Sequence, residues 1–147
     1  EDEFLLAQND LRISTDLNTK EFLGITKEKT FYCSVISHAY YSIFYCAKAY
    51  LLTKNIVTKV PEEHKKTYEE FKKFVYSGEL NKELLEIYED AINKAETLLK
   101  IFFNEKRKRG LFVYNIKAEA NLLHAEESIK RSKKFISLIE GLIENEK

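Results

Sequence analysis

Residues that interrupt helices are scarce in this sequence, which has one proline and four glycines among 147 residues. Gly and Pro mark most turns and loops, so their scarcity suits an all-helical protein with few turns and argues against a turn-rich fold. No internal repeat, low-complexity segment or charge block divides the chain. We therefore expect a single domain, residues 1–147, which is long enough to bury a core of its own.

Net charge is also absent, because 24 lysines and arginines balance 24 aspartates and glutamates. A balanced chain exerts no overall attraction on a polyanion, so any binding of nucleic acid has to come from a local cluster of basic residues. The composition is rich in Lys, Glu and Ile and has a single Gln, which is compatible with a thermophilic source.

Cysteine and histidine are too few and too scattered to indicate a disulfide or a metal site. Cys33 and Cys46 lie thirteen residues apart on one predicted helix. That spacing puts them roughly 20 Å apart, beyond the reach of a disulfide. Reduced thiols fit a cytoplasmic protein. His38, His64 and His124 show no metal-ligand spacing with each other or with the cysteines, so we expect no metal and no cofactor.

The longest apolar stretch is residues 31–52, FYCSVISHAYYSIFYCAKAYLL, and no formal charge occurs from Thr30 to Ala47. It is too long and uninterrupted for a strand, which predicts a helix over residues 27–54. Its apolar residues surround the helix axis, so it must be buried on several sides. The other helices are expected to pack around it, and a second subunit is a candidate to cover one side. The charge-free part is shorter than the ~20 residues that cross a bilayer, so we expect a soluble core helix and no membrane association.

The remaining periodicity predicts an antiparallel helical bundle of four long helices and one short helix. We expect Asn55 to end the central helix in a left-handed conformation, Pro61 to begin the short helix, and Asn81 to cap the helix after it. The expected helices cover 3–17, 27–54, 61–77, 81–106 and a final segment that ends near Asn145. The expected connections are 18–26, 56–60 and an apolar link at 111–116.

Three segments resemble the HEPN domain, a small helical bundle. They are AYYSIFYCAKAYLL at 39–52, His64, and FKKFVYSGEL at 71–80, and they occur in the order typical of that family. The resemblance extends over roughly residues 5–142. It implies a homodimer formed through the central helices, for which Tyr41, Phe44 and Tyr45 are the candidate interface. It also implies a minimal nucleotidyltransferase as the protein partner, in a toxin–antitoxin-like module.

Many members of this family are metal-independent ribonucleases that carry Arg-x(4–6)-His near the start of the last helix. This sequence departs from that pattern, because Arg109 is followed by Tyr114 in an Arg-x4-Tyr arrangement. Cleavage by the RNA 2′-hydroxyl needs proton transfer near neutral pH, which imidazole supplies. A tyrosine with a pKa of about 10 is a poor base at that pH. His38 shares one face of the central helix with Tyr41 and could take the place of the missing histidine, although a packing role for His38 is the simpler interpretation.

Two basic runs remain as candidate phosphate-binding residues. The first, residues 106–109, is either a solvated helix end or a site for RNA phosphate, formed by Lys106, Arg107, Lys108 and Arg109. The second, residues 130–134, is expected to be a solvated face. His64 is expected to be a surface or packing residue.

The leading hypothesis is a homodimer that binds RNA or nucleotide, or pairs with a nucleotidyltransferase, and that lacks ribonuclease activity. One alternative is a metal-independent endoribonuclease toxin that uses Arg109 with Tyr114 or His38. The other alternative is a structural dimerisation module of a longer chain.

Overall fold

In the computed structural model, the backbone is described for residues 1–26, 30–108 and 111–145, and the side chains for the same ranges without 101–121. The described residues contain no strand, and the prediction of an all-helical protein is confirmed. They form six α-helices: α1 (Asp2–Thr15), α2 (Leu17–Phe22), α3 (Tyr32–Thr53), α4 (Glu63–Tyr76), α5 (Lys82–Lys108) and α6 (Leu111–Asn145). None of the described helices combines the length and the apolar character that a bilayer crossing requires.

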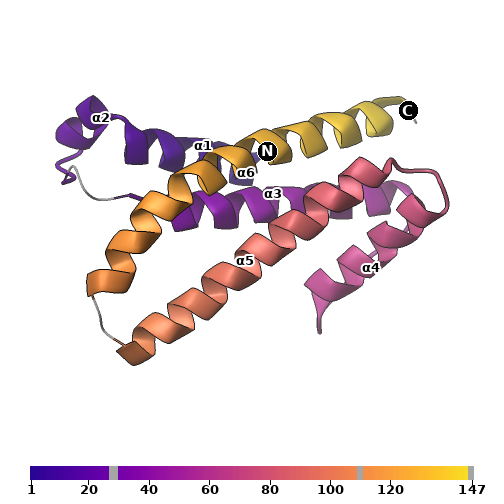
Figure 1. The fold of residues 1–147 in the computed structure, drawn as a ribbon. Coiled ribbons are helices and arrows are strands. Elements are labelled where there is room, and N and C mark those ends of the chain that lie inside the picture. The colour runs from indigo at the N-terminus through magenta and orange to yellow at the C-terminus, as the bar shows by residue number, and fades with distance from the viewer. Residues whose placement is uncertain (27–29, 109–110, 146–147) are drawn as a thin grey trace.

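Helix α3 lies at the centre of the molecule and packs against α1, α4, α5 and α6 (Figure 1). Its buried residues surround much of the helix, from Tyr32 near its start to Leu51 near its end. The expectation of a central helix buried on several sides is therefore confirmed. Residues 27–29, which were assigned to the start of this helix, lie outside the described residues.

The core divides into two clusters along α3. The α1-side cluster joins α1, the first half of α3 and α6 through Ala7, Tyr32, Val35, Ile36, Ala39 and Ala125. The α4-side cluster joins the second half of α3 to α4, α5 and α6 through Ile43, Ala47, Tyr50, Phe71, Val75, Leu80, Leu84, Leu85, Ile87, Tyr88, Phe135 and Ile139. Helices α3 and α6 thus contribute to both clusters, whereas the buried residues of α1 and α4 belong to one cluster each.

Several helix ends follow the predicted signals. Asn55 has φ +60° directly after α3, as expected for a left-handed cap. Gly78 has φ +86° after α4, a conformation that glycine adopts without steric cost. The Oδ1 atom of Asn81 accepts a hydrogen bond of 2.9 Å from the Glu83 N–H at the start of α5.

The expected connection at 18–26 is wrong, because it contains most of α2. Asp16 is the N-cap of this short helix and accepts hydrogen bonds at Oδ1 from the N–H groups of Asn18 (2.9 Å) and Thr19 (3.3 Å). The Thr19 hydroxyl donates a further bond to Asp16 Oδ2. These bonds hold the pKa of the Asp16 carboxyl below its usual value, led by the bonds from Thr19. A capping aspartate therefore starts a second helix where the apolar periodicity showed none.

Two other predicted boundaries are also wrong. Pro61 does not begin the short helix, because Glu62 takes the N-cap position with φ +58° and α4 starts at Glu63. The apolar link predicted at 111–116 is the first part of α6, which starts at Leu111. That segment contains neither Gly nor Pro, so no residue in it prevents the helix from extending to its start.

Ion pairs join α5 and α6 where the second basic run was expected to be solvated. Lys94 Nζ lies 3.3 Å from Glu127 Oε2, and Arg131 Nε lies 3.7 Å from Asp90 Oδ2. Lys134 pairs with Glu83 at the other end of the contact. The run at 130–134 is therefore partly engaged in holding the two helices together, which reduces the positive charge that it offers to a phosphate.

Candidate functional site

The predicted phosphate-binding cluster lies at the junction of α5 and α6. Residues 106–108 form the last turn of α5, and Tyr114 is in the first turn of α6. The side chains of Lys106, Arg107, Lys108 and Tyr114, and the whole of Arg109, lie outside the described residues. The structure therefore does not test their proposed roles in RNA binding and catalysis.

His38, the third candidate catalytic residue, is bound by acidic side chains of α1. Its Nδ1 atom lies 2.5 Å from Glu3 Oε2, and its Nε2 atom lies 3.7 Å from Asp10 Oδ2. Asp10 also accepts a hydrogen bond of 2.7 Å from the Ser34 hydroxyl. Both ring nitrogens thus face carboxylates of the same chain, and this arrangement fixes α1 against α3.

The three candidate interface residues differ in exposure. Tyr41 and Tyr45 are 40% and 53% exposed, and their rings stack with centroids 6.5 Å apart. Phe44 is 1% exposed, because the imidazole of His64 stacks on its ring at a centroid distance of 3.9 Å. Phe44 therefore belongs to the interior of the chain, and of the three candidate residues Tyr41 and Tyr45 have exposed rings.

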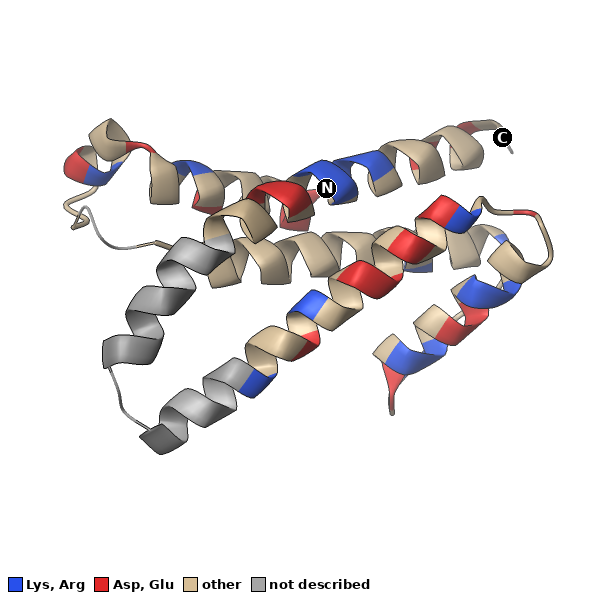
Figure 2. Cartoon of the chain, in the orientation of Figure 1, with Lys and Arg blue, Asp and Glu red and all other residues tan. Residues whose placement is uncertain are grey.

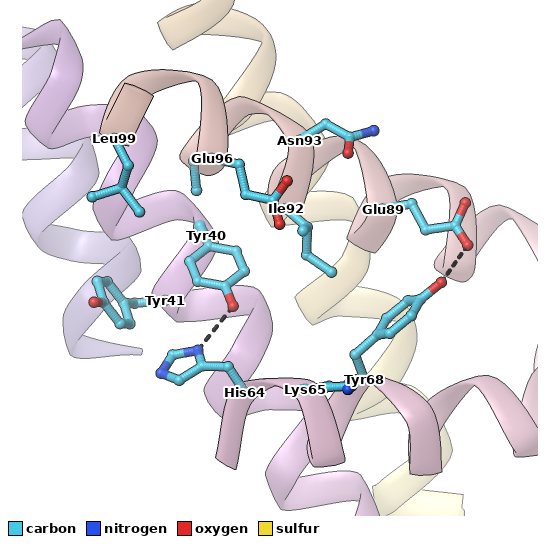
Figure 3. A pocket seen from close by; sticks show the side chains of 11 residues that line it. Tyr40, Tyr41, His64, Lys65, Tyr68, Glu89, Ile92, Asn93, Glu96 and Leu99 are labelled. Carbon is cyan, nitrogen blue, oxygen red and sulfur yellow. Dashed lines mark hydrogen bonds between the residues drawn. The ribbon is translucent and has the colours of Figure 1, made fainter. Parts of the chain in front are cut away.

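A groove of about 720 Å³ opens between α3, α4 and α5 (Figure 3). Residues from three helices line this groove. Tyr40 and Tyr41 are adjacent on α3, and His64 and Tyr68 are four residues apart on α4. On α5, residues 89, 92, 93 and 96 share one face, because side chains three, four and seven positions apart align along a helix. The groove therefore combines aromatic rings with charged and amide groups.

Two hydrogen bonds fix the tyrosines of the groove. The Tyr40 hydroxyl lies 2.8 Å from His64 Nδ1, and the Tyr68 hydroxyl donates to Glu89 Oε1 at 2.6 Å. Burial, together with the nearby charge of Tyr41, raises the pKa of Tyr40 to about 12. Burial and the bond to Glu89 raise the pKa of Tyr68 to about 12 as well. Both phenols are consequently protonated at neutral pH and act there as hydrogen-bonding groups rather than as bases.

Sequence reasoning missed this groove, although it noticed some of its parts. His64 was expected to be a surface or packing residue, and in the structure it does pack, on Phe44, while also lining the groove. Glu89 and Glu96 lie on the predicted helix 81–106 with the seven-residue spacing that places them on one face. That spacing is the sequence signal for an acidic helix face, but it does not show which other helices lie opposite this face.

The described residues contain no group of three or more His, Cys, Asp or Glu side chains that could hold a metal ion. Acidic residues recur along α5 in Figure 2. Two acidic residues of α5, Glu83 and Asp90, form ion pairs with α6. The described residues of the groove offer hydrogen-bonding groups, aromatic rings and charged side chains.

Comparisons with known proteins give one informative relative. No family model matches the chain, and no solved structure matches it. A protein of Methanocaldococcus jannaschii named "Putative toxin MJ0142" is 37% identical over 92 residues, which cover 62% of this chain and 54% of that protein. The matched part thus spans about half the length of the relative, and the similarity of this chain is to a protein that is named as a toxin.

Proposed function

We propose that this chain is a HEPN-type component of a toxin–antitoxin-like module that binds RNA or a nucleotide as a homodimer. The toxin name of the 37% identical relative supports the module. The all-helical fold and the order of the motifs AYYSIFYCAKAYLL, His64 and FKKFVYSGEL support the HEPN type and its antiparallel bundle. A minimal nucleotidyltransferase is the protein partner that this assignment implies.

The single observation that carries the binding function is the groove between α3, α4 and α5. Its rings include Tyr40, Tyr41 and Tyr68, and exposed aromatic rings stack on unpaired bases of single-stranded RNA. Helix α5 lines the groove up to Leu99 and continues to Lys108, so residues 106–108 of the basic sequence lie on the same helix. A strand that leaves the groove along α5 would meet cations that bind its phosphates.

The role is binding rather than cleavage, because the sequence lacks the histidine of the ribonuclease motif. Four residues separate Arg109 from Tyr114, which stands where the motif has its histidine, and an ordinary phenol is a poor base at neutral pH. His38 is held between Glu3 and Asp10, which ties its ring to α1.

A metal-independent endoribonuclease is the second candidate, and the toxin name of the relative favours it. In that case Arg109 would stabilise the charge on the reacting phosphate. The Tyr114 hydroxyl would donate a hydrogen bond there, so Tyr114→Phe would abolish cleavage and leave RNA affinity nearly intact.

Both candidates can be tested with a fluorescent oligouridine in EDTA, by anisotropy for binding and by gel electrophoresis for cleavage. We expect intact RNA and an affinity that falls steeply with salt, because binding releases counterions. Arg109→Ala should lower the salt slope by about one, whereas Arg12→Ala on α1, the matched control, should not. Cleavage that Arg109→Ala abolishes would favour the nuclease, and the absence of binding at low salt would contradict both candidates.

A further inference from the structure

Two charged groups in the groove have no partner among the described residues. The Tyr40 and Tyr68 hydroxyls are paired with His64 and Glu89. The carboxylate of Glu96 and the ammonium group of Lys65 make no hydrogen bond or ion pair with any described residue. Charged side chains that line a concave site without a partner are available to a ligand.

These two groups lie on different walls. Glu96 extends from α5 towards Tyr40 in Figure 3, and its charge is close enough to contribute to the raised pKa of that tyrosine. Lys65 comes from α4, next to His64. The groove therefore presents a hydrogen-bond acceptor on one wall and a cation on the other, with aromatic and aliphatic surface that includes Tyr40, Tyr41 and Ile92.

The size and the apolar surface of the groove suit a flat heterocycle with a short charged substituent. A volume of about 720 Å³ is that of a small-molecule site and holds a mononucleotide. The rings of Tyr40 and Tyr41 meet at an interplanar angle of 55°, and their centroids are 5.5 Å apart. A base that enters this corner contacts the face of one ring and the edge of the other, and both contacts are favourable for aromatic groups.

The free carboxylate selects among the bases, because an ionised carboxylate only accepts hydrogen bonds. Guanine presents two adjacent donors on its Watson–Crick edge, N1–H and the 2-amino group, which match the two oxygens of a carboxylate. Adenine presents an acceptor, N1, at the central position of that edge, and uracil presents one donor between two acceptors. A carboxylate therefore binds guanine in a bidentate manner and repels part of the edge of the other two bases.

We propose that the groove is a guanine site, in which Glu96 accepts hydrogen bonds from guanine N1–H and the 2-amino group, and Lys65 binds the attached phosphate. The inference rests on the proposed binding of RNA or nucleotide and names the base that is recognised. A guanidinium or alkylammonium cation also offers donors to Glu96. The positive charge of Lys65 disfavours such a cation and favours a ligand that carries both donors and a phosphate.

Isothermal titration of the intact protein with GMP, IMP and AMP tests the choice of base. We expect GMP to bind about tenfold more tightly than AMP, the size of effect found for bidentate base contacts. IMP, which lacks the 2-amino group, should bind with intermediate affinity. Comparable affinities for GMP and AMP would overturn the proposal, and so would methylguanidine binding as tightly as GMP.

Two substitutions test the assigned residues. Glu96→Gln replaces one acceptor oxygen by a donor, so it should remove the preference for GMP over AMP. Glu86→Gln, an exposed glutamate of α5 outside the groove, is the matched control and should preserve the preference. Wild-type protein should bind GMP more tightly than guanosine, because guanosine has no phosphate for Lys65 to bind. Lys65→Gln should abolish this difference in affinity. An unchanged preference in Glu96→Gln would overturn the assignment.

The oligouridine experiment separates this inference from the proposed function, because that RNA contains no guanine. Oligouridine binding that depends on Arg109, without any preference for GMP, would overturn the guanine site and leave the RNA-binding function intact. A GMP preference that depends on Glu96, without any binding of oligouridine, would support the guanine site and contradict binding through the basic sequence.

Discussion

At the scale of single residues, burial gives the two cysteines different chemistry. Cys33 is exposed near the start of α3, whereas Cys46, in its second half, is partly buried. Burial, together with the negative charge of Glu140, raises the pKa of the Cys46 thiol to about 12. Only the thiolate reacts with disulfide reagents, and at about pH 8 roughly one Cys46 thiol in ten thousand is ionised.

We therefore expect Ellman's reagent, at about pH 8, to label Cys33 quickly and Cys46 slowly in the folded protein, as measured by absorbance of the released thiolate. Cys33→Ser should remove the fast reaction, and Cys46→Ser should keep it. In urea the two thiols should react at similar rates. A fast reaction in folded Cys33→Ser would contradict the raised pKa of Cys46.

The aromatic residues of α3 and α6 show how much of a side chain's surroundings the sequence can predict. The sequence identifies the aromatic character of α3 and places Tyr41 and Tyr45 on one helix face, whereas the exposure of both side chains is seen only in the structure. It does not show that Phe44 is covered by His64, because that contact joins two helices through a connection at 54–62 whose path depends on tertiary packing. Phe135, 0% exposed and central to the α4-side cluster, was missed for a similar reason. The rings of Phe71 on α4 and Tyr88 on α5 pack against it, and the sequence does not show that these helices meet α6 there.

At the scale of secondary-structure elements, the helix cap at Asn81 makes a measurable contribution to the free energy of unfolding. Asn81 Oδ1 satisfies a backbone N–H that has no partner within the first turn of α5. Asn81→Ala should lower the free energy of unfolding by about 1 kcal/mol, as measured by urea denaturation. Asn81→Asp retains the acceptor and should leave the stability nearly unchanged. Equal losses in the two variants would show that the cap is not the source of the stability.

Most helices could be predicted, because the signals for them are local. Apolar periodicity and helix-end signals depend on residues that are close in sequence. The structure shows the helix-end conformations at Asn55, Gly78 and Asn81. The wrongly predicted helix boundaries occur where two local signals compete. Asp16 was read as part of the first helix although it can cap a new one, and Pro61 was placed inside a helix whose cap is the next residue.

At the scale of the whole molecule, the exposed pair Tyr41 and Tyr45 is the surface on which the proposed homodimer depends. Stacked aromatic rings on a central helix form a patch that a second copy can cover with the same patch. Tyr45→Glu should shift the dimer to monomer, because dimerisation would bury a charge, and light scattering measures the mass. Tyr76→Glu is the matched control, since Tyr76 is exposed at the end of α4. A monomeric wild type at micromolar concentration would contradict the homodimer.

The division of the core into two clusters has a consequence for fluctuations. Proteins open locally in units that can have different free energies of opening. Helix α4 packs on α3 and α5 within the α4-side cluster, and α1 packs within the α1-side cluster, so each can detach transiently while the other remains docked. Helices α3 and α6 pass through both clusters and open only when both are lost. Because α4 forms one wall of the groove, we expect its local opening to widen the groove while the α1-side cluster stays packed.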